Sequence, residues 1–339
     1  MRLSSLRVPT RISALILTAA MATTAFASGS FASTADQSAA TKSTATATTD
    51  DTKTKFGGTI YENAGESYEQ AYQRVTNAYG GSLDAIRYFF PGLPTSWSKL
   101  NQKVHNTPLV VSFRADPAAV LAGKYDAQLK QWFADAPTDH RTNWSYWHEP
   151  ENDSVDKAKY KAAWQHIDKL ANAANNPRLK STLILMCWSL NPHSGRNWQD
   201  WYPGDSTIDV LGFDCYNTGR KSGVYRDPQN VLQPAADAAA KVGKPWGVAE
   251  FGTTVINSDG GEQGRAAWLK GMANYARNNG ATFATYFDSY VGFDYRLHDT
   301  TSKTPGRTSS RTTDPSLPKA GARPGGARRA RVCSPSWGI

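Results

Sequence analysis

The sequence predicts an α/β protein in which one domain, residues 55–299, folds as a (β/α)8 barrel. Eight short apolar runs recur in these 245 residues, and each is followed by a loop and then by a stretch with helical periodicity. Most of the runs are continuously apolar, which is typical of parallel strands buried on both faces. The length also agrees with the roughly 250 residues of one such barrel.

The expected strands can be placed in order from these runs. They occupy residues 56–61, 85–90, 108–113, 143–149, 181–188, 207–216, 245–251 and 281–289. A doubly wound open sheet is the alternative, but no glycine-rich phosphate-binding loop follows the first strand. We interpret residues 259–265 as a loop that enters a helix.

Three stretches between the strands show clear helical features. Ser67 and Gln70 have the spacing of a capping box, which predicts a helix beginning there. The clearest apolar helix face consists of Tyr160, Trp164, Ile167, Ala171 and Ala174. A further apolar face is predicted for Leu121, Tyr125, Leu129 and Trp132.

The two ends of the chain differ in composition from this central part. Residues 1–27 combine three arginines, an apolar run and an Ala-Phe-Ala sequence, which predicts a signal peptide and a secreted, extracellular protein with no membrane attachment after cleavage. Residues 28–54 are rich in Ser, Thr and Ala and are expected to form a disordered leader. Residues 300–339 are rich in Pro, Gly and Arg and are expected to form a disordered basic tail.

This tail begins where a helix should cover the seam between the eighth strand and the first. We therefore expect the barrel to lack a normal final helix, and we hypothesise that the reading frame changes near residue 300. The tail and residues 1–27 also carry the basic charge. Of the net charge of +9, they contribute +7 and +3, which leaves −1 for residues 28–299, so we expect no nucleic-acid partner.

Three cysteines in 339 residues exclude a disulfide-rich scaffold. Cys187 and Cys215 lie near the ends of two predicted strands, and a bridge between them requires those strands to be neighbours. We favour buried free thiols.

Acidic side chains follow the apolar runs at the positions where a barrel of this type builds its active site. Glu149 ends the fourth run and Glu250 ends the seventh, and these strands face each other across an eight-stranded barrel. Cleavage of a glycosidic bond requires two such carboxyl groups. One is a protonated acid that assists the leaving oxygen, and the other is an anion that attacks or activates water.

The motifs "YWHEPEN" and "PWGVAEFG" resemble the acid/base and nucleophile strands of clan A glycoside hydrolases. The histidine before the first glutamate, His148, resembles glycoside hydrolase family 26, the β-mannanase family. The resemblance implies that Glu149 is the acid/base and Glu250 the nucleophile of a retaining mechanism. It also implies that Tyr216, on the sixth strand, orients the nucleophile.

The expected function is therefore hydrolysis of a β-linked polysaccharide, with β-mannan favoured. An endo-β-glucanase or xylanase of the same clan is the alternative, as is a non-catalytic carbohydrate-binding barrel or a cell-wall protein that acts through its basic tail. We expect a monomer with no cofactor. We also expect no metal, because the six histidines are far apart in the sequence.

Further side chains near the strand ends are predicted to bind the substrate. Tryptophan rings stack on sugars, and the eighth strand offers tyrosine where many clan members place tryptophan. Arg87, on the second strand, has two possible uses, either to bind a sugar hydroxyl or to pair with a catalytic carboxylate. The predicted substrate-binding residues are His148, Arg87, Trp188, Asp214, Trp147 and Tyr286.

Overall fold

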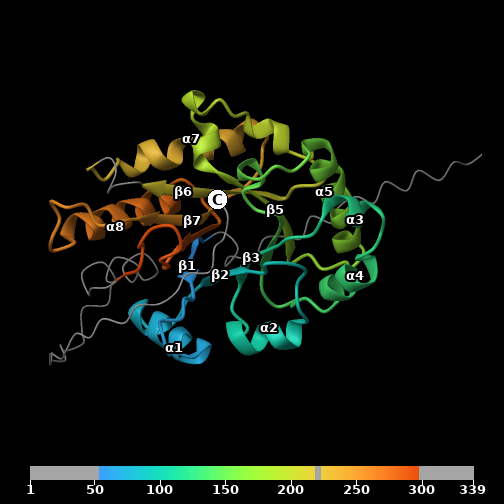
Figure 1. The fold of residues 1–339 in the computed structure, drawn as a ribbon, viewed down its shortest axis with the longest axis horizontal. Coiled ribbons are helices and arrows are strands. Elements are labelled where there is room, and N and C mark those ends of the chain that lie inside the picture. Colours follow the sequence, from blue (N-terminus) through green and yellow to red (C-terminus); the bar gives the residue numbers. More distant parts are fainter. Residues whose placement is uncertain (1–52, 218–222, 298–339) are drawn as a thin grey trace, which may run out of the picture. The chain divides into compact units, whose positions relative to one another are not determined.

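The computed structural model describes residues 53–217 and 223–297, and it confirms the predicted barrel. Eight parallel strands pair in chain order and close where β8 pairs with β1 (Figure 1). The strands are β1 (Lys55–Thr59), β2 (Ala85–Phe89), β3 (Leu109–Phe113), β4 (Thr142–Tyr146), β5 (Leu179–Met186), β6 (Val210–Asn217), β7 (Trp246–Thr253) and β8 (Phe283–Tyr286). Each of the eight expected strands overlaps one of them.

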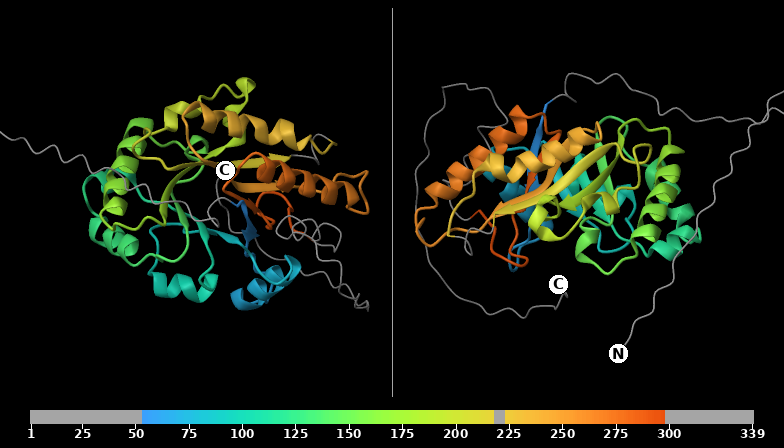
Figure 2. Two further views of the ribbon diagram at one scale, coloured as in Figure 1. Left: turned by 180° about the vertical axis from the view of Figure 1, so that it is seen from behind. Right: turned by 90° about the horizontal axis from the view of Figure 1, so that it is seen from above.

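Helices follow the strands and lie on the outside of the barrel (Figure 2). They are α1 (Tyr68–Ala78), α2 (Trp97–Val104), α3 (Pro117–Leu121), α4 (Asp126–Ala134), α5 (Lys157–Asn172), α7 (Pro228–Lys241) and α8 (Gln263–Asn278). Short 3-10 helices lie in the loops after β4 and β5, namely η1 (Pro150–Asn152), η2 (Cys187–Leu190), η3 (Pro192–Ser194) and η4 (Trp198–Trp201).

The predicted capping box is confirmed at the start of α1. The Ser67 hydroxyl accepts a hydrogen bond from the Gln70 backbone N–H at 3.2 Å, and the Gln70 side chain accepts one from the Ser67 N–H at 2.8 Å. The single helix face predicted for residues 121–132 is wrong. Gly123, with φ of 72°, separates α3 from α4, and Leu121 is 42% exposed.

The core consists of a small cluster inside the barrel and a larger layer between the strands and the helices. The inner cluster contains Val110, Ile184, Val210, Ala249 and Phe283. A Cβ atom at Gly247 would lie 2.6 Å from the Phe283 ring, so only glycine fits beside this large side chain. The barrel interior is thus filled with side chains, and a ligand has room only at its ends.

The two cysteines near the strand ends form a disulfide, contrary to the free thiols that we favoured. Cys187 begins η2, directly after β5, and Cys215 lies on the neighbouring strand β6, with 4.9 Å between their Cα atoms. The pairing of β5 with β6 is a tertiary contact, and it brings the two residues within bonding reach.

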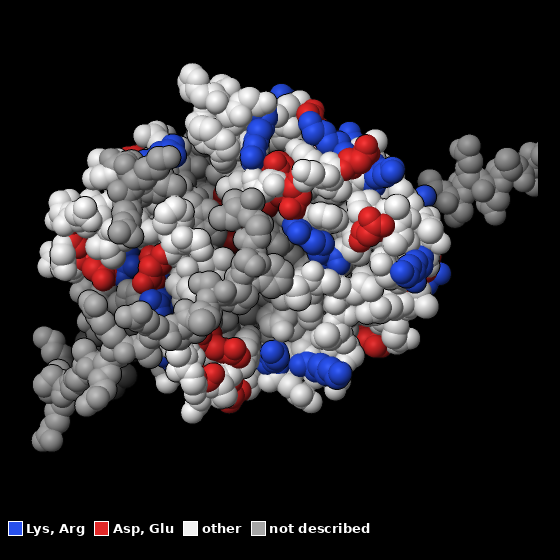
Figure 3. All heavy atoms as spheres, in the orientation of Figure 1, with Lys and Arg blue, Asp and Glu red and all other residues white. Residues whose placement is uncertain are grey.

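Several predictions concern the ends of the chain and lie outside the described residues. They are the signal peptide, nearly all of the leader, the basic tail with Cys333 and the missing final helix, and they remain predictions. Within the described part of the chain, no helix combines the length and the apolar composition that crossing a membrane requires. On the face drawn in Figure 3, acidic and basic side chains are interspersed.

Candidate active site

A pocket of about 690 Å³ lies at the carboxyl ends of the barrel strands and contains both predicted catalytic glutamates. Its walls come from most of the strands and from the segment that follows β8. The lining residues are Thr59, Ile60, Tyr61, Arg87, Tyr88, Phe89, His148, Glu149, Met186, Tyr216, Glu250, Phe287, Ser289, Val291, Gly292 and Tyr295. The aromatic side chains among them are suited to contact the apolar faces of sugar rings.

The backbone after β4 turns sharply to place Glu149 in this pocket. Trp147 has φ of 52° and Glu149 has φ of 50°, values that are uncommon for residues other than glycine. Hydrogen bonds to the neighbouring strands stabilise this turn. The Trp147 N–H donates to the Phe113 carbonyl at 2.8 Å, and the Glu149 N–H donates to the Ile184 carbonyl at 3.0 Å. The strained conformation is thus held by the tertiary structure.

The environment of the Glu149 carboxyl group favours its protonated form. Burial, followed by the negative charges of Glu250 and Glu151, raises its pKa from 4.5 to about 8. The Asn152 side-chain amide donates a hydrogen bond to Oε2 of Glu149 at 3.1 Å and opposes this shift. At neutral pH the group therefore holds a proton, as a general acid must.

Glu250, on β7, has an opposite set of neighbours. Arg87 donates to its Oε1 from Nη2 at 2.9 Å and from Nε at 3.1 Å, and the Tyr216 hydroxyl donates to its Oε2 at 2.5 Å. All three donors are complementary to a carboxylate anion. Arg87 is fully buried and also donates to the Ser112 hydroxyl at 2.6 Å, so its place beneath the pocket is fixed. Of its two possible uses, the structure shows pairing with the carboxylate.

His148 and Asp214 lie close to the two glutamates but differ in their access to the pocket. His148 lines it, and burial together with the charge of Arg87 lowers the pKa of its imidazole well below the usual range. Asp214, which we expected to bind substrate, is buried beside Glu250 in the pairing of β6 with β7 and does not line the pocket. Neither of its carboxyl oxygens has a hydrogen-bond partner among the described residues.

Burial, followed by the charges of Glu250 and Glu149, raises the pKa of Asp214 well above its usual range. A proton on Asp214 therefore avoids a second buried negative charge beside the carboxylate of Glu250.

The structure does not bring the other three predicted aromatic residues into the pocket. The Trp147 indole donates to Asp153 at 2.6 Å beneath the side chain of Arg114, and Trp188 lies on η2 with 48% of its surface exposed. Tyr286 is buried on the other side of β8, because adjacent strand residues point in opposite directions. The pocket aromatic from this strand end is the next residue, Phe287.

The role of Glu151 was not apparent from the sequence. Its Oε1 accepts hydrogen bonds from the Met186 N–H at 2.8 Å and the Ser189 hydroxyl at 2.9 Å, so it connects the loop after β4 to the end of β5. Within residues 53–217 and 223–297, no group of three or more His, Cys, Asp or Glu side chains is arranged to hold a metal ion.

Comparison with known proteins agrees with this geometry. Residues 138–291, which include β4 to β8 and both glutamates, match the model of Glycosyl hydrolase family 26. Over these residues the chain is similar to glycoside hydrolase family 26. The resemblance of the two motifs to clan A enzymes is thereby confirmed.

Two solved structures and one curated relative are similar to this protein over part of the chain. A family 26 β-mannanase from Bacteroides ovatus has a TM-score of 0.51 at 15% identity, with 77% of this chain and 89% of that chain covered. A glucosidase from Croceicoccus marinus has a TM-score of 0.53 at 14% identity, with 76% of this chain and 66% of that chain covered. At such identities these structures share the fold with this barrel. Endoglucanase H from Acetivibrio thermocellus is 23% identical over 268 residues, which are 72% of this chain but only 29% of that protein.

Proposed function

We propose that this protein is a secreted, retaining glycoside hydrolase that cleaves a β-linked polysaccharide, with β-mannan as the favoured substrate. The observation that carries the proposal is the contrast between two glutamates in one pocket. Burial and negative neighbours raise the pKa of Glu149 to about 8, whereas Glu250 is bound by an arginine and a tyrosine hydroxyl. Such a division of environments assigns one carboxyl group as acid and the other as nucleophile.

The first step uses both groups at once. Glu149 donates its proton to the glycosidic oxygen while Glu250 attacks the anomeric carbon, so that the leaving sugar departs and a covalent glycosyl-enzyme forms. In the second step, Glu149 removes a proton from water, which attacks the anomeric carbon and releases the carboxylate of Glu250.

The same electrostatics support the change of Glu149 from acid to base. The charge of Glu250 is one cause of the raised pKa of Glu149, and ester formation removes that charge. The pKa of Glu149 therefore falls in the intermediate, which prepares it to accept a proton from water. Hydrolysis of the ester restores both the charge and the raised pKa.

The substrate assignment is supported by the family and by one of its solved members. The matched structure from Bacteroides ovatus is a β-mannanase, whereas the curated relative is an endoglucanase. A β-glucan is therefore the second candidate substrate. Secretion is supported by the composition of residues 1–27. Recovery of the protein from the culture medium and sequencing of its N-terminus test this. Protein confined to the cells would contradict secretion, and a retained residue 1 would contradict cleavage of the signal peptide.

The test of the activity is release of reducing ends from galactomannan, mixed-linkage β-glucan and xylan, with Glu250→Gln as the matched inactive variant. We expect the wild type to cleave galactomannan and the variant to be at least 1,000-fold slower, an order of magnitude typical for loss of a catalytic nucleophile. If the folded wild type cleaves none of the three polymers, or the variant retains its rate, the proposal is refuted.

Stereochemistry tests retention separately. In the initial products, the new reducing end should be the β-anomer by proton NMR before mutarotation. Azide should rescue Glu250→Ala and yield an α-glycosyl azide, because the small anion enters from the face that the nucleophile has vacated. An initial α-anomer from the wild type would indicate an inverting mechanism.

A further inference from the structure

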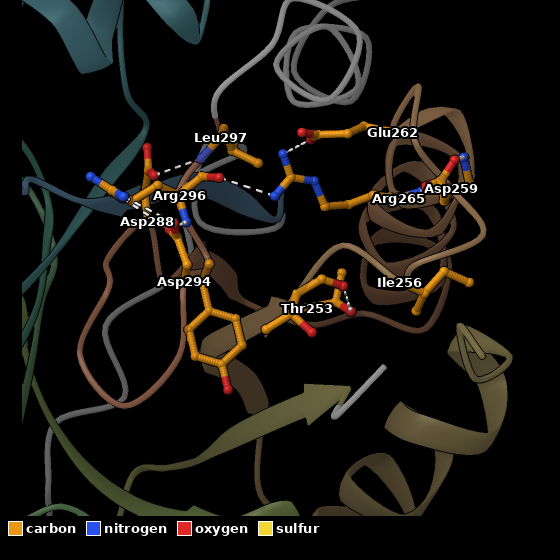
Figure 4. A network of polar contacts seen from close by, with 12 residues as sticks. Thr253, Ile256, Asp259, Glu262, Arg265, Asp288, Asp294, Arg296 and Leu297 are labelled. Atoms are coloured by element: carbon orange, nitrogen blue, oxygen red, sulfur yellow. Dashed lines mark hydrogen bonds and ion pairs between the residues drawn. The ribbon is translucent and has the colours of Figure 1, made fainter. Parts of the chain in front are cut away.

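The segment after β8 forms one wall of the pocket. We call residues 288–297 the strap. Its two ends are joined, since the Asp288 carboxylate accepts a hydrogen bond from the Leu297 N–H at 3.0 Å (Figure 4). Between these ends, Ser289, Val291, Gly292 and Tyr295 line the pocket. The strap therefore faces any sugar that lies between the two glutamates.

Tyr295 is firmly held within the strap. Its N–H donates to the Ser289 carbonyl at 2.9 Å, and its carbonyl accepts from the Tyr286 hydroxyl at 2.5 Å. Its ring lies 5.1 Å from the ring of Tyr216, the residue that donates to Glu250. Only 6% of Tyr295 is exposed. Backbone and ring are thus fixed before any ligand binds.

The hydroxyl of Tyr295 is available to a ligand. It has no hydrogen-bond partner among the described residues, although the side chain lines the pocket. Burial, followed by the negative charge of Glu149, raises the pKa of Tyr295 to about 12. The hydroxyl therefore keeps its proton at neutral pH and lies within electrostatic range of the acid/base, able both to donate and to accept a hydrogen bond.

A buried arginine outside the barrel holds the strap in place. Arg265, on α8, donates from Nη1 to the Arg296 carbonyl at 3.0 Å and forms an ion pair with Glu262. Figure 4 shows its guanidinium between the strap and the loop that enters α8. The Arg265 side chain is fully buried, so water cannot take over its hydrogen bonds unless the surrounding chain rearranges. Its bond to the strap is made one residue after Tyr295.

We propose that Tyr295 is a substrate-contacting residue whose hydroxyl binds a sugar hydroxyl beside Glu149. This proposal rests on the proposed hydrolase function. In the same proposal, Arg265 is a positioning residue that acts through the strap. A hydroxyl that lacks a protein partner in an aromatic pocket gains one from the sugar, which favours bound substrate over free enzyme. The predicted ligand group is a hydroxyl of the leaving sugar, which carries away the glycosidic oxygen that receives the proton of Glu149.

The first test compares Tyr295→Phe with Tyr290→Phe. Both changes remove one hydroxyl from the strap and keep the ring, but Tyr290 is 51% exposed and does not line the pocket. On the polymer that the wild type cleaves, we expect Tyr295→Phe to lower kcat/KM about three- to tenfold, the range for one neutral hydrogen bond. Tyr290→Phe should remain within about twofold. Equal kcat/KM for Tyr295→Phe and wild type overturns the proposal and leaves the proposed function intact.

The second test is a double-mutant cycle between Arg265→Lys and Tyr295→Phe. If Arg265 acts through Tyr295, the Arg265→Lys substitution should raise KM more than it lowers kcat in the otherwise wild-type protein. In the Tyr295→Phe background, the same substitution should change kcat/KM by less than about twofold. Equal effects in both backgrounds overturn the positioning role. If Arg265→Lys does not fold, Glu262→Gln takes its place, since it removes the ion pair and keeps the side-chain shape. A wild type without activity on any glycan refutes the proposed function and this inference with it.

Discussion

The raised pKa of Glu149 predicts a stability change that depends on pH. Its carboxyl group binds a proton more tightly in the folded state, with a pKa of about 8, than at the ordinary value of 4.5. Below pH 4.5 the group is protonated in both the folded and unfolded states. As the pH rises from 4.5 toward 8, the unfolded state ionises freely and the folded state does not, so the free energy of unfolding falls.

The size of this loss follows from the two pKa values. Each pKa unit corresponds to about 1.4 kcal/mol. At pH 7 the solution is about 2.5 pH units above the pKa of the unfolded group, which is ionised, while the folded group is still mostly protonated. The cost of Glu149 at pH 7 is therefore about 3 kcal/mol. Glutamine has nearly the same shape and does not ionise. Glu149→Gln should thus raise the free energy of unfolding by about 3 kcal/mol at pH 7 and leave it nearly unchanged at pH 4.

Urea unfolding at pH 4 and pH 7, with unchanged m values, measures the difference directly. Glu66→Gln is a control of opposite sign, because the hydrogen bond from Arg74 lowers the pKa of Glu66 to about 2. That variant should lose stability at pH 7, and the loss should shrink as the pH falls toward 2. An equal effect of Glu149→Gln at pH 4 and pH 7, or a destabilised variant at pH 7, would refute the reasoning.

Three further predictions concern activity and the disulfide. Since Glu149 must be protonated in the first step, kcat/KM should fall as the pH rises through about 8. With an aryl glycoside that has a good leaving group, the Glu149→Ala variant should no longer show this fall at high pH. If the fall is unchanged in the variant, it belongs to another group. Tyr216→Phe removes a donor to the Glu250 carboxylate and should lower kcat about 10- to 100-fold in steady-state assays, whereas a change below threefold would exclude this role. Replacing both Cys187 and Cys215 with serine opens a loop of 28 residues and should lower the free energy of unfolding by about 3 to 4 kcal/mol in urea without reductant, whereas an unchanged midpoint would show that the bridge does not form.

The sequence by itself determined the barrel, the order of its strands and the position of the two glutamates. These features depend on local patterns. Apolar runs of strand length separated by helical periods indicate parallel buried strands, and the last polar residue of such a run lies at the carboxyl end of the barrel. The cap at Ser67 was likewise predictable, because its hydrogen bonds join residues only three positions apart.

The tertiary structure alone decided features that depend on contacts between distant residues. The pairing of Arg87 with Glu250 joins positions 163 residues apart, and the choice of Phe287 over Tyr286 for the pocket depends on how β8 is oriented in the closed barrel. The disulfide required β5 and β6 to be neighbours. The pKa of Glu149 also depends on tertiary structure, because burial and the charge of Glu250 act only after the chain has folded.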